Sequence, residues 1–377
     1  MDAQLNEEQR RLQQSARDFL TRECPMSSVR LQMEDTRGFS DGFWQQLAEL
    51  GWTGIALPEA HGGAGLGAVE LAVVLEEMGA ALAPAPFFSS VVLGASVIAR
   101  AGTREQQGRW LPELASGKRR ATLATQEPGG SAIGPVRLIA REEAGGLRIS
   151  GAKAFVPDGH TAHDLVVAVR RGSASGPLAL AVVPAEVRGV SARPVDYTDA
   201  TRKVAEVTFD DVAVPGDAIL GGGEDASAAL EATLDFARVG LCAEMAGIGQ
   251  RVLDLSVAFA KTREQFGKPI GSFQAIQHKC ADMLLRVENM RSAAWYSAWA
   301  LDEGAPDAHA AACMAQAYAS EACAHVAGEG IQIHGGLGYT WEQDLHLYYK
   351  RAKANEVALG DASQHRELVA GLMLGGA

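Results

Sequence analysis

The chain has 377 residues, 47% hydrophobic and 21% charged, which is ordinary for a globular protein and enough for two or three domains. A net charge of −12 without any Lys/Arg-rich run argues against a nucleic-acid partner. No apolar run reaches the ~18 residues of a membrane span. The charged N-terminal stretch "MDAQLNEEQRRLQQ" is not typical of a signal peptide.

Five widely spaced cysteines form no CxxC pair, so we expect reduced, mostly buried thiols in a cytoplasmic protein. The stretch "HTAH", with His160 and His163, comes closest to a metal motif. We expect no metal there, because a site needs three or four convergent ligands.

Residues 1–117 read as a helical domain. "DGFWQQLAELGW" has a start signal at Asp41 and apolar residues at helical spacing. "AVELAVVLEEMGAAL" and "SSVVLGASVIARAG" predict two further apolar helices, and "TREQQGRWLPELASG" predicts a helix interrupted at Pro112.

One glycine-rich stretch in this domain, "HGGAGLGA", places Gly63, Gly65 and Ala68 in a GxGxxA arrangement. This pattern superficially matches the dinucleotide-binding fingerprint. The β-α-β alternation of such a fold is missing downstream, which favours a flexible turn instead.

The sequence pattern of residues 118–221 predicts a β domain, either a small barrel or a sandwich. Valine-rich runs separated by Gly, Pro and Asp predict its strands, namely "LRISGAKAFV", "DLVVAVR", "LALAVVP" and "KVAEVTFDDVAVP". From 222 to 377 long helical patterns return, at about 224–266, 272–304 and 306–330, with a shorter one from Ala362. Long helices with short connections predict a four-helix bundle.

Two glycine-containing breaks interrupt the C-terminal helices. "TREQFGKPIGSFQ" is either a simple connection or an anion site, since Arg263, Lys268 and Gln274 flank the start of a new helix. In "IQIHGGLGYTWE", Gly335 and Gly336 would let a ligand approach the backbone closely.

These breaks, together with "TQEPGGS" and "FDDVAVP", resemble the acyl-CoA dehydrogenase family in the same order along the chain. The resemblance covers essentially the whole sequence. It implies an α+β fold with an N-terminal helical domain, a middle β domain and a C-terminal four-helix bundle. It also implies FAD as cofactor, an acyl-CoA substrate, an electron-transfer flavoprotein as electron acceptor, and a homo- or heterotetramer.

Carried over residue by residue, the resemblance predicts where FAD would bind. The diphosphate and adenine from the adjacent chain would meet Arg263, Phe266 and Gln274, and the pyrophosphate would lie along Gln332, Gly335 and Gly336. On the flavin side the predicted residues are Thr125, Gln126, Ser131 and Phe155. Two departures stand out: the "EPGGS" turn is one residue short, and Pro157 replaces a residue whose hydroxyl often bonds the flavin.

The family's catalytic base is a glutamate that removes the α-proton of the thioester. The usual position holds Leu359 here, and the alternative position, before Arg238, holds Ala237. Asp361 is a candidate substitute, but Gln364 three residues later also predicts a capping box at the start of the last helix.

Two hypotheses follow from the empty base positions. In the first, the chain is a subunit of a heteromeric acyl-CoA dehydrogenase whose partner carries the glutamate. In the second, it is self-sufficient, either as a dehydrogenase with Asp361 as base or as a flavin monooxygenase of the same fold.

Overall fold

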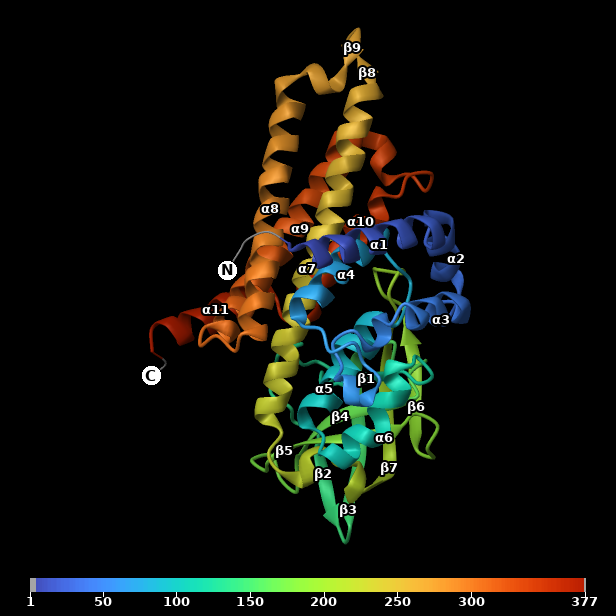
Figure 1. Cartoon of the computed structure of the whole chain (residues 1–377), viewed down its shortest axis with the longest axis vertical. Helices are drawn as coiled ribbons and strands as arrows, with labels where there is room; N and C mark the ends of the chain where they lie inside the picture. Colours follow the sequence, from blue (N-terminus) through green and yellow to red (C-terminus); the bar gives the residue numbers. More distant parts are fainter. Residues whose placement is uncertain (1–4, 376–377) are drawn as a thin grey trace. The chain divides into compact units, whose positions relative to one another are not determined.

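A computed structural model describes residues 5–375 of the chain (Figure 1). Its α-helices are α1 (Glu7–Glu23), α2 (Met26–Glu34), α3 (Asp41–Glu49), α4 (Ala68–Ala81), α5 (Ser96–Ala101), α6 (Arg104–Ala115), α7 (Ser227–Thr262), α8 (Gln274–Asp302), α9 (Ala308–His334), α10 (Leu345–Ala358) and α11 (Ala362–Met373). Its strands are β1 (Ala121–Ala124), β2 (Ile139–Glu143), β3 (Gly146–Pro157), β4 (Asp164–Arg171), β5 (Leu178–Pro184), β6 (Val190–Val195), β7 (Val204–Pro215), β8 (Glu264–Gln265) and β9 (Lys268–Pro269).

The chain divides into two compact units. Unit 1 comprises residues 1–30, 68–83 and 238–377, and unit 2 comprises residues 31–67 and 84–237. Along the sequence the expected order is confirmed: helices, then a curled β-sheet, then a helical bundle. The domain boundaries at 117/118 and 221/222 remain a prediction.

Strands β1 to β7 of unit 2 form one sheet in the order β1-β4-β2-β3-β7-β6, with β5 on the other edge of β4. The four valine-rich runs of the sequence are β3, β4, β5 and β7, so this prediction is confirmed. In β4 and β5 almost every residue is buried, whereas β7 alternates between buried and exposed residues. A strand covered on both faces reads as a continuous apolar run, and a half-covered strand reads as alternation.

The N-terminal helices differ from expectation in two details. The first half of the run "SSVVLGASVIARAG", expected as ordinary helix, lies in the π-helical segment η3 (Phe88–Ala95), which continues into α5. The expected interruption at Pro112 is wrong, since α6 continues through it. The proline leaves the carbonyl of Gly108, four residues earlier, without its helical hydrogen bond. Both residues are exposed, so water can bond this carbonyl instead. Helix α3 begins at Asp41 as predicted, with Ser40 as its cap.

The GxGxxA stretch forms a turn, as favoured by the sequence. The backbone N–H groups of Ala64 and Gly65 donate to the carbonyls of Gly54 and Leu57. A Cβ at Gly63 would overlap the backbone of Leu57, so close chain approach explains that glycine.

Unit 1 is built around the long helices α7, α8, α9 and α10. Figure 1 shows α7 and α8 running antiparallel and joined at one end by the β8–β9 hairpin. Helix α9 packs on α8, α10 and α11, and Gly330 of α9 lies against Val252 of α7. The predicted bundle is confirmed, but α10 had no counterpart among the predicted helices.

Helices α4 and α7 of unit 1 cross at unusually close range. A Cβ added to Gly79 of α4 would overlap the carbonyl oxygen of Glu244, and one added to Gly247 of α7 would overlap that of Glu76. Each glycine therefore receives the backbone of the opposite helix. Close backbone approach of this kind requires glycine and fixes the register of the two helices.

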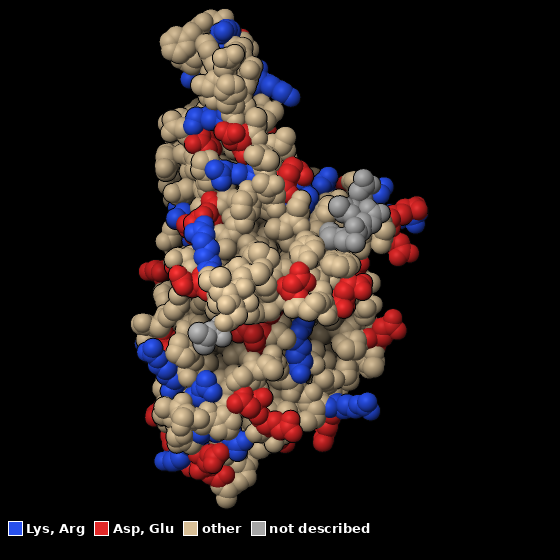
Figure 2. Space-filling model, turned by 90° about the vertical axis from the view of Figure 1, so that its left-hand side faces the viewer, with Lys and Arg blue, Asp and Glu red and all other residues tan. Residues whose placement is uncertain are grey.

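Surface charges are mixed in sign. Figure 2 shows basic and acidic side chains interspersed over the face in view, without a field of one sign. Among the described residues, no helix is both long and apolar enough to cross a membrane.

The helix crossing yields the first prediction. Gly247→Ala should lower the unfolding free energy by about 1–3 kcal/mol, because a methyl group cannot fit against the Glu76 carbonyl without moving α4. The matched control is Gly108→Ala in α6, where an added Cβ meets nothing within 4 Å. That control should be neutral or stabilising by up to ~1 kcal/mol. Thermal unfolding of both variants measures the difference, and equal midpoints would contradict the crossing.

Candidate active site and cofactor surface

The predicted base position lies in the turn that joins α10 to α11. Leu359 is the C-cap of α10 and is 8% exposed, and its N–H donates to the carbonyl of Val357. Gly360 follows with φ +94°, a conformation that favours glycine. The turn itself therefore uses the Leu359 N–H donor, which leaves it unavailable to a ligand.

A hydrogen bond from His365 stabilises this turn. Its Nε2 lies 2.8 Å from the carbonyl oxygen of Leu359, and the residue is fully buried. Because a carbonyl only accepts, Nε2 carries the proton in this contact. The contact fixes the backbone at the predicted base position.

Asp361 is the N-cap of α11. Its Oδ1 accepts the N–H of Gln364 at 2.8 Å, and the Gln364 side chain accepts the N–H of Asp361 at 3.0 Å. The predicted capping box is therefore confirmed. Asp361 itself is exposed, unlike the desolvated carboxylate that removes a weakly acidic proton.

Ala237, at the alternative base position, is completely buried within α7 and carries no group that can accept a proton. Arg238 follows it and is 2% exposed.

A buried polar network that the sequence analysis missed lies on α7 and α10. Arg351 Nη1 donates to Glu244 Oε1 at 3.1 Å, and Asn355 Nδ2 donates to the same oxygen at 3.0 Å. Arg351, Asn355 and Leu359 are spaced four residues apart, so they follow one face of α10. A possible signal was the charged Glu244 in the apolar run "GLCAEMAG".

The β8–β9 hairpin presents the first group of predicted cofactor residues. Phe266 is 93% exposed with φ +55°, and its ring meets Phe273 edge-on at 6.1 Å. Lys268 lies over the Phe273 ring at 4.4 Å. Arg263 and Gln274 are exposed, and no side-chain partner of Arg263 exists within the described part of the chain. The hairpin thus offers an aromatic ring and unpaired positive charge.

The second glycine-rich break lies beside the hairpin. Phe259 of α7 stacks on His334 of α9 with ring centroids 4.1 Å apart, which brings the ends of these helices together. Gln332, Gly335 and Gly336 are exposed, and a Cβ added at either glycine would meet nothing within 4 Å. Open space next to bare backbone suits a diphosphate, so these residues fit the pyrophosphate end of FAD.

In unit 2 the turn after β1 holds Thr125, Gln126 and Ser131, three of the residues predicted for the flavin side. Gln126 Nε2 donates to the carbonyl of Gly130, and the carbonyl of Gln126 accepts the N–H of Ala154. The second bond places the turn next to Phe155 of β3. Thr125, Gln126 and Ser131 line a cavity of ≈ 90 Å³ together with neighbouring residues of the turn.

A buried ion pair anchors this turn. Lys153 Nζ, fully buried, donates to Glu127 Oε1 at 2.8 Å and to the carbonyl of Thr125 at 3.0 Å. Burial acts to raise the pKa of Glu127, but the bonds from Lys153 and from the N–H groups of Leu138 and Arg137 lower it overall. Burial also lowers the pKa of Lys153. The pair fixes the loop that carries Thr125 and Gln126.

Phe155 is half-exposed with φ +50°, and its ring lies 6.2 Å from that of Tyr197. It is therefore available for aromatic contact. Pro157 offers only its carbonyl, which accepts the Thr122 hydroxyl at 2.7 Å. The flavin side fits an aromatic ligand but provides no hydroxyl at position 157.

Comparisons with known proteins agree with this arrangement. The family model "Acyl-CoA dehydrogenase, N-terminal domain" matches residues 6–118, and "Acyl-CoA dehydrogenase, C-terminal domain" matches residues 227–374. The probable acyl-CoA dehydrogenase YngJ of Bacillus subtilis is 31% identical, over 99% of this chain and 100% of its own length.

Two solved structures are also similar. A variant of the Tcur3481–Tcur3483 steroid ACAD is 34% identical, with a TM-score of 0.88 over 98% of both chains. The ChsE4–ChsE5 complex of Mycobacterium tuberculosis is 28% identical, with a TM-score of 0.91 and 100% coverage of both chains. The chain therefore belongs to the acyl-CoA dehydrogenase family of FAD-dependent oxidoreductases, which act on acyl-CoA thioesters.

Proposed function

We propose that this chain is one subunit of a heteromeric acyl-CoA dehydrogenase, in which a homologous partner subunit carries the catalytic glutamate. The observation that carries the proposal is the turn around Leu359. Its backbone is held firmly by His365 and Gly360, yet its side chain cannot accept a proton.

Dehydrogenation of an acyl-CoA needs a carboxylate in contact with the α-proton, within ~3 Å. Leu359 and Ala237 offer none, and Asp361 is an exposed cap two residues from the base position. The reaction also needs donors for the developing negative charge on the thioester oxygen. The Leu359 N–H is already bonded to Val357. The missing carboxylate and the engaged N–H both indicate that the partner subunit, and not this chain, carries out the proton abstraction.

The chain's contribution is the cofactor surface. Arg263, Phe266 and Gln274, with Gln332, Gly335 and Gly336, would hold the diphosphate and adenine of the FAD in a neighbouring subunit. The open glycines and the unpaired Arg263 support this role. FAD supplies the hydride acceptor of the dehydrogenation, and an electron-transfer flavoprotein is the proposed acceptor of the electrons.

On its own flavin side the chain would use Thr125, Gln126, Ser131 and Phe155. Pro157 provides no hydroxyl there. We therefore propose that the flavin-side residues bind FAD less tightly than the residues that this chain offers to the FAD of a neighbouring subunit.

Exposed apolar side chains support assembly into a tetramer. They lie on α8 and α11, as Leu284, Leu285, Leu372 and Met373. The two similar structures are described by the names of two chains, Tcur3481–Tcur3483 and ChsE4–ChsE5, which is consistent with a heteromeric relative. None of the five cysteines forms a disulfide in the described part of the chain, which fits the proposed reducing cytoplasm.

The second prediction separates subunit from enzyme. Expressed alone, the chain should not oxidise acyl-CoA with a ferricenium acceptor. Co-expressed with a glutamate-bearing homologue it should co-purify as a heterotetramer that does. Replacing the partner's glutamate by glutamine should abolish that activity. A homotetramer of this chain alone that dehydrogenates acyl-CoA would disprove the proposal, and NADPH-dependent oxygen consumption would indicate a monooxygenase.

The third prediction concerns Asp361 in the co-purified complex. Asp361→Asn should leave both activity and stability nearly unchanged, since asparagine caps a helix as well as aspartate does. Asp361→Ala should keep activity but lower stability by about 1 kcal/mol. A loss of about 10²-fold in kcat/KM in the asparagine variant, with FAD retained, would instead identify Asp361 as the base.

The fourth prediction concerns the hairpin. Arg263→Gln should reduce the FAD content of the complex, because a charge-assisted bond to the diphosphate is lost. Arg104→Gln, an exposed arginine at the start of α6, is the matched control and should leave FAD content unchanged. Flavin absorbance per protein measures the effect. Equal FAD content in the two variants would argue against the assignment of the hairpin.

A further inference from the structure

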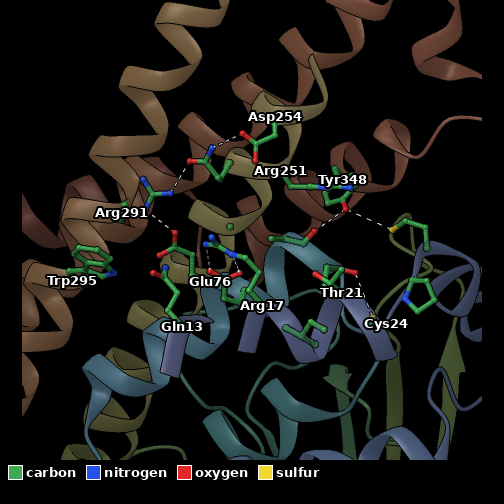
Figure 3. Close-up of a pocket in the computed structure, with 18 residues that line it drawn as sticks. Gln13, Arg17, Thr21, Cys24, Glu76, Arg251, Asp254, Arg291, Trp295 and Tyr348 are labelled. Carbon is green, nitrogen blue, oxygen red and sulfur yellow. Dashed lines mark hydrogen bonds and ion pairs between the residues drawn. The ribbon is translucent and has the colours of Figure 1, made fainter. Parts of the chain in front are cut away.

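Unit 1 contains a cavity apart from the base turn and the cofactor surface. It has a volume of ≈ 670 Å³, within the range of small-molecule sites, and it lies among α1, α4, α7, α8 and α10. Its walls combine charged side chains with apolar ones. Figure 3 shows Trp295, Arg291, Glu76 and Gln13 grouped on one side, with Thr21 and Tyr348 on the other.

A chain of hydrogen bonds runs along one wall from the interior to the surface. Arg291 Nε donates to Glu76 Oε1 at 2.8 Å, and Arg291 Nη2 donates to Gln250 Oε1 at 2.9 Å. Gln250 Nε2 then donates to Asp254 Oδ1 at 2.9 Å. The remaining Arg291 nitrogen bonds the exposed Glu288. Each of the three Arg291 side-chain nitrogens therefore has a partner, two of them in the wall and one at the surface.

The charges of the cavity are also matched in pairs. Arg17 forms a two-pronged ion pair with Glu77, at 3.0 and 2.7 Å. Arg291 is shared between Glu76 and Glu288. At the mouth, Arg251 and Asp254 add one charge of each sign. A ligand with a large net charge would disturb this balance, so the cavity favours a ligand of no net charge.

Two buried polar atoms on the same side of the cavity remain without a partner in the described part of the chain. One is Oε2 of Glu76, a residue that is only 4% exposed, and the other is Nε1 of Trp295. Such groups are costly unless something bonds them. Glu76 Oε2 requires a donor and the indole N–H requires an acceptor. Burial raises the pKa of Glu76, although the charge of Arg291 opposes this shift.

We propose that the cavity binds a small zwitterion of the α-amino acid class. The ammonium group would donate to Glu76 Oε2, and the adjacent carboxylate would accept from Trp295 Nε1–H. This ligand carries no net charge and meets both unsatisfied atoms at once. An ammonium–carboxylate bond is also stronger than a bond between neutral groups, which favours it over a simple alcohol.

Binding is tested on the full-length protein, in whatever assembly it purifies, by calorimetry with individual L-amino acids. Each amino acid that binds is compared with its decarboxylated amine and its deaminated acid, such as L-leucine with isopentylamine and 4-methylpentanoate. The zwitterion should bind, and each single-charge analogue should bind at least about tenfold more weakly.

Two pairs of variants locate the site. Glu76→Gln and Trp295→Phe should each weaken binding by about tenfold or more, since each removes one of the unpartnered groups. Their controls are Glu288→Gln, which alters the exposed partner of Arg291, and Trp299→Phe, one turn along α8. Both controls should bind as the unmodified chain does. If Glu76→Gln folds poorly, Trp295→Phe still decides the question.

Three results would overturn the proposal. One is that no amino acid binds at millimolar concentration. Another is that binding is the same in Glu76→Gln and Trp295→Phe as in the controls. The third is that the amine alone binds as tightly as the zwitterion, which would make the cavity a cation site. The test uses no catalytic readout, so its outcome is independent of the proposed heteromeric function.

Discussion

The close crossing of α4 and α7 is the constraint on which the rest of unit 1 depends. Gly79 and Gly247 each receive a backbone carbonyl of the opposite helix, from Glu244 and Glu76 respectively. The contact therefore fixes where both glutamates stand along their helices. From there, Glu76 meets Arg291 on the wall of the cavity, and Glu244 meets Arg351 and Asn355 of α10. One packing contact thus sets the position of two separate polar networks.

The network on α10 in turn bears on the base position. Arg351, Asn355 and Leu359 share one face of the helix, and a buried Arg–Glu pair is costly to break once formed. The Leu359 turn is therefore held by the α10 network on one side and by the hydrogen bond from His365 to its carbonyl on the other. At the position proposed for the base, the turn is held in place although Leu359 carries no acid, so the absence of a carboxylate there is compatible with a stable fold.

Much of the fold could be predicted from the sequence because its signals are local. The valine runs of β4 and β5, the long helical patterns of α7 and α8, and the capping box of Asp361 each depend on neighbours in the chain. What could not be predicted depends on contacts between distant segments. The pairing of Glu244 with Arg351 joins residues 107 apart, and Glu76 with Arg291 joins residues 215 apart. The prediction at Pro112 failed for the opposite reason. A proline does remove one backbone hydrogen bond from a helix, but at this exposed position water can replace it, so α6 continues.

The two parts of the candidate site also differ in how the fold holds them. The residues proposed to meet the cofactor at the hairpin are exposed: Phe266 touches only Phe273 edge-on, and the Arg263 side chain has no partner in the described part of the chain. The turn at Leu359 is buried and fully engaged with its own unit. Figure 1 places the hairpin and α11 well apart within unit 1. This separation within unit 1 is what would allow one chain, as proposed, to complete a partner's cofactor site without supplying the catalytic acid.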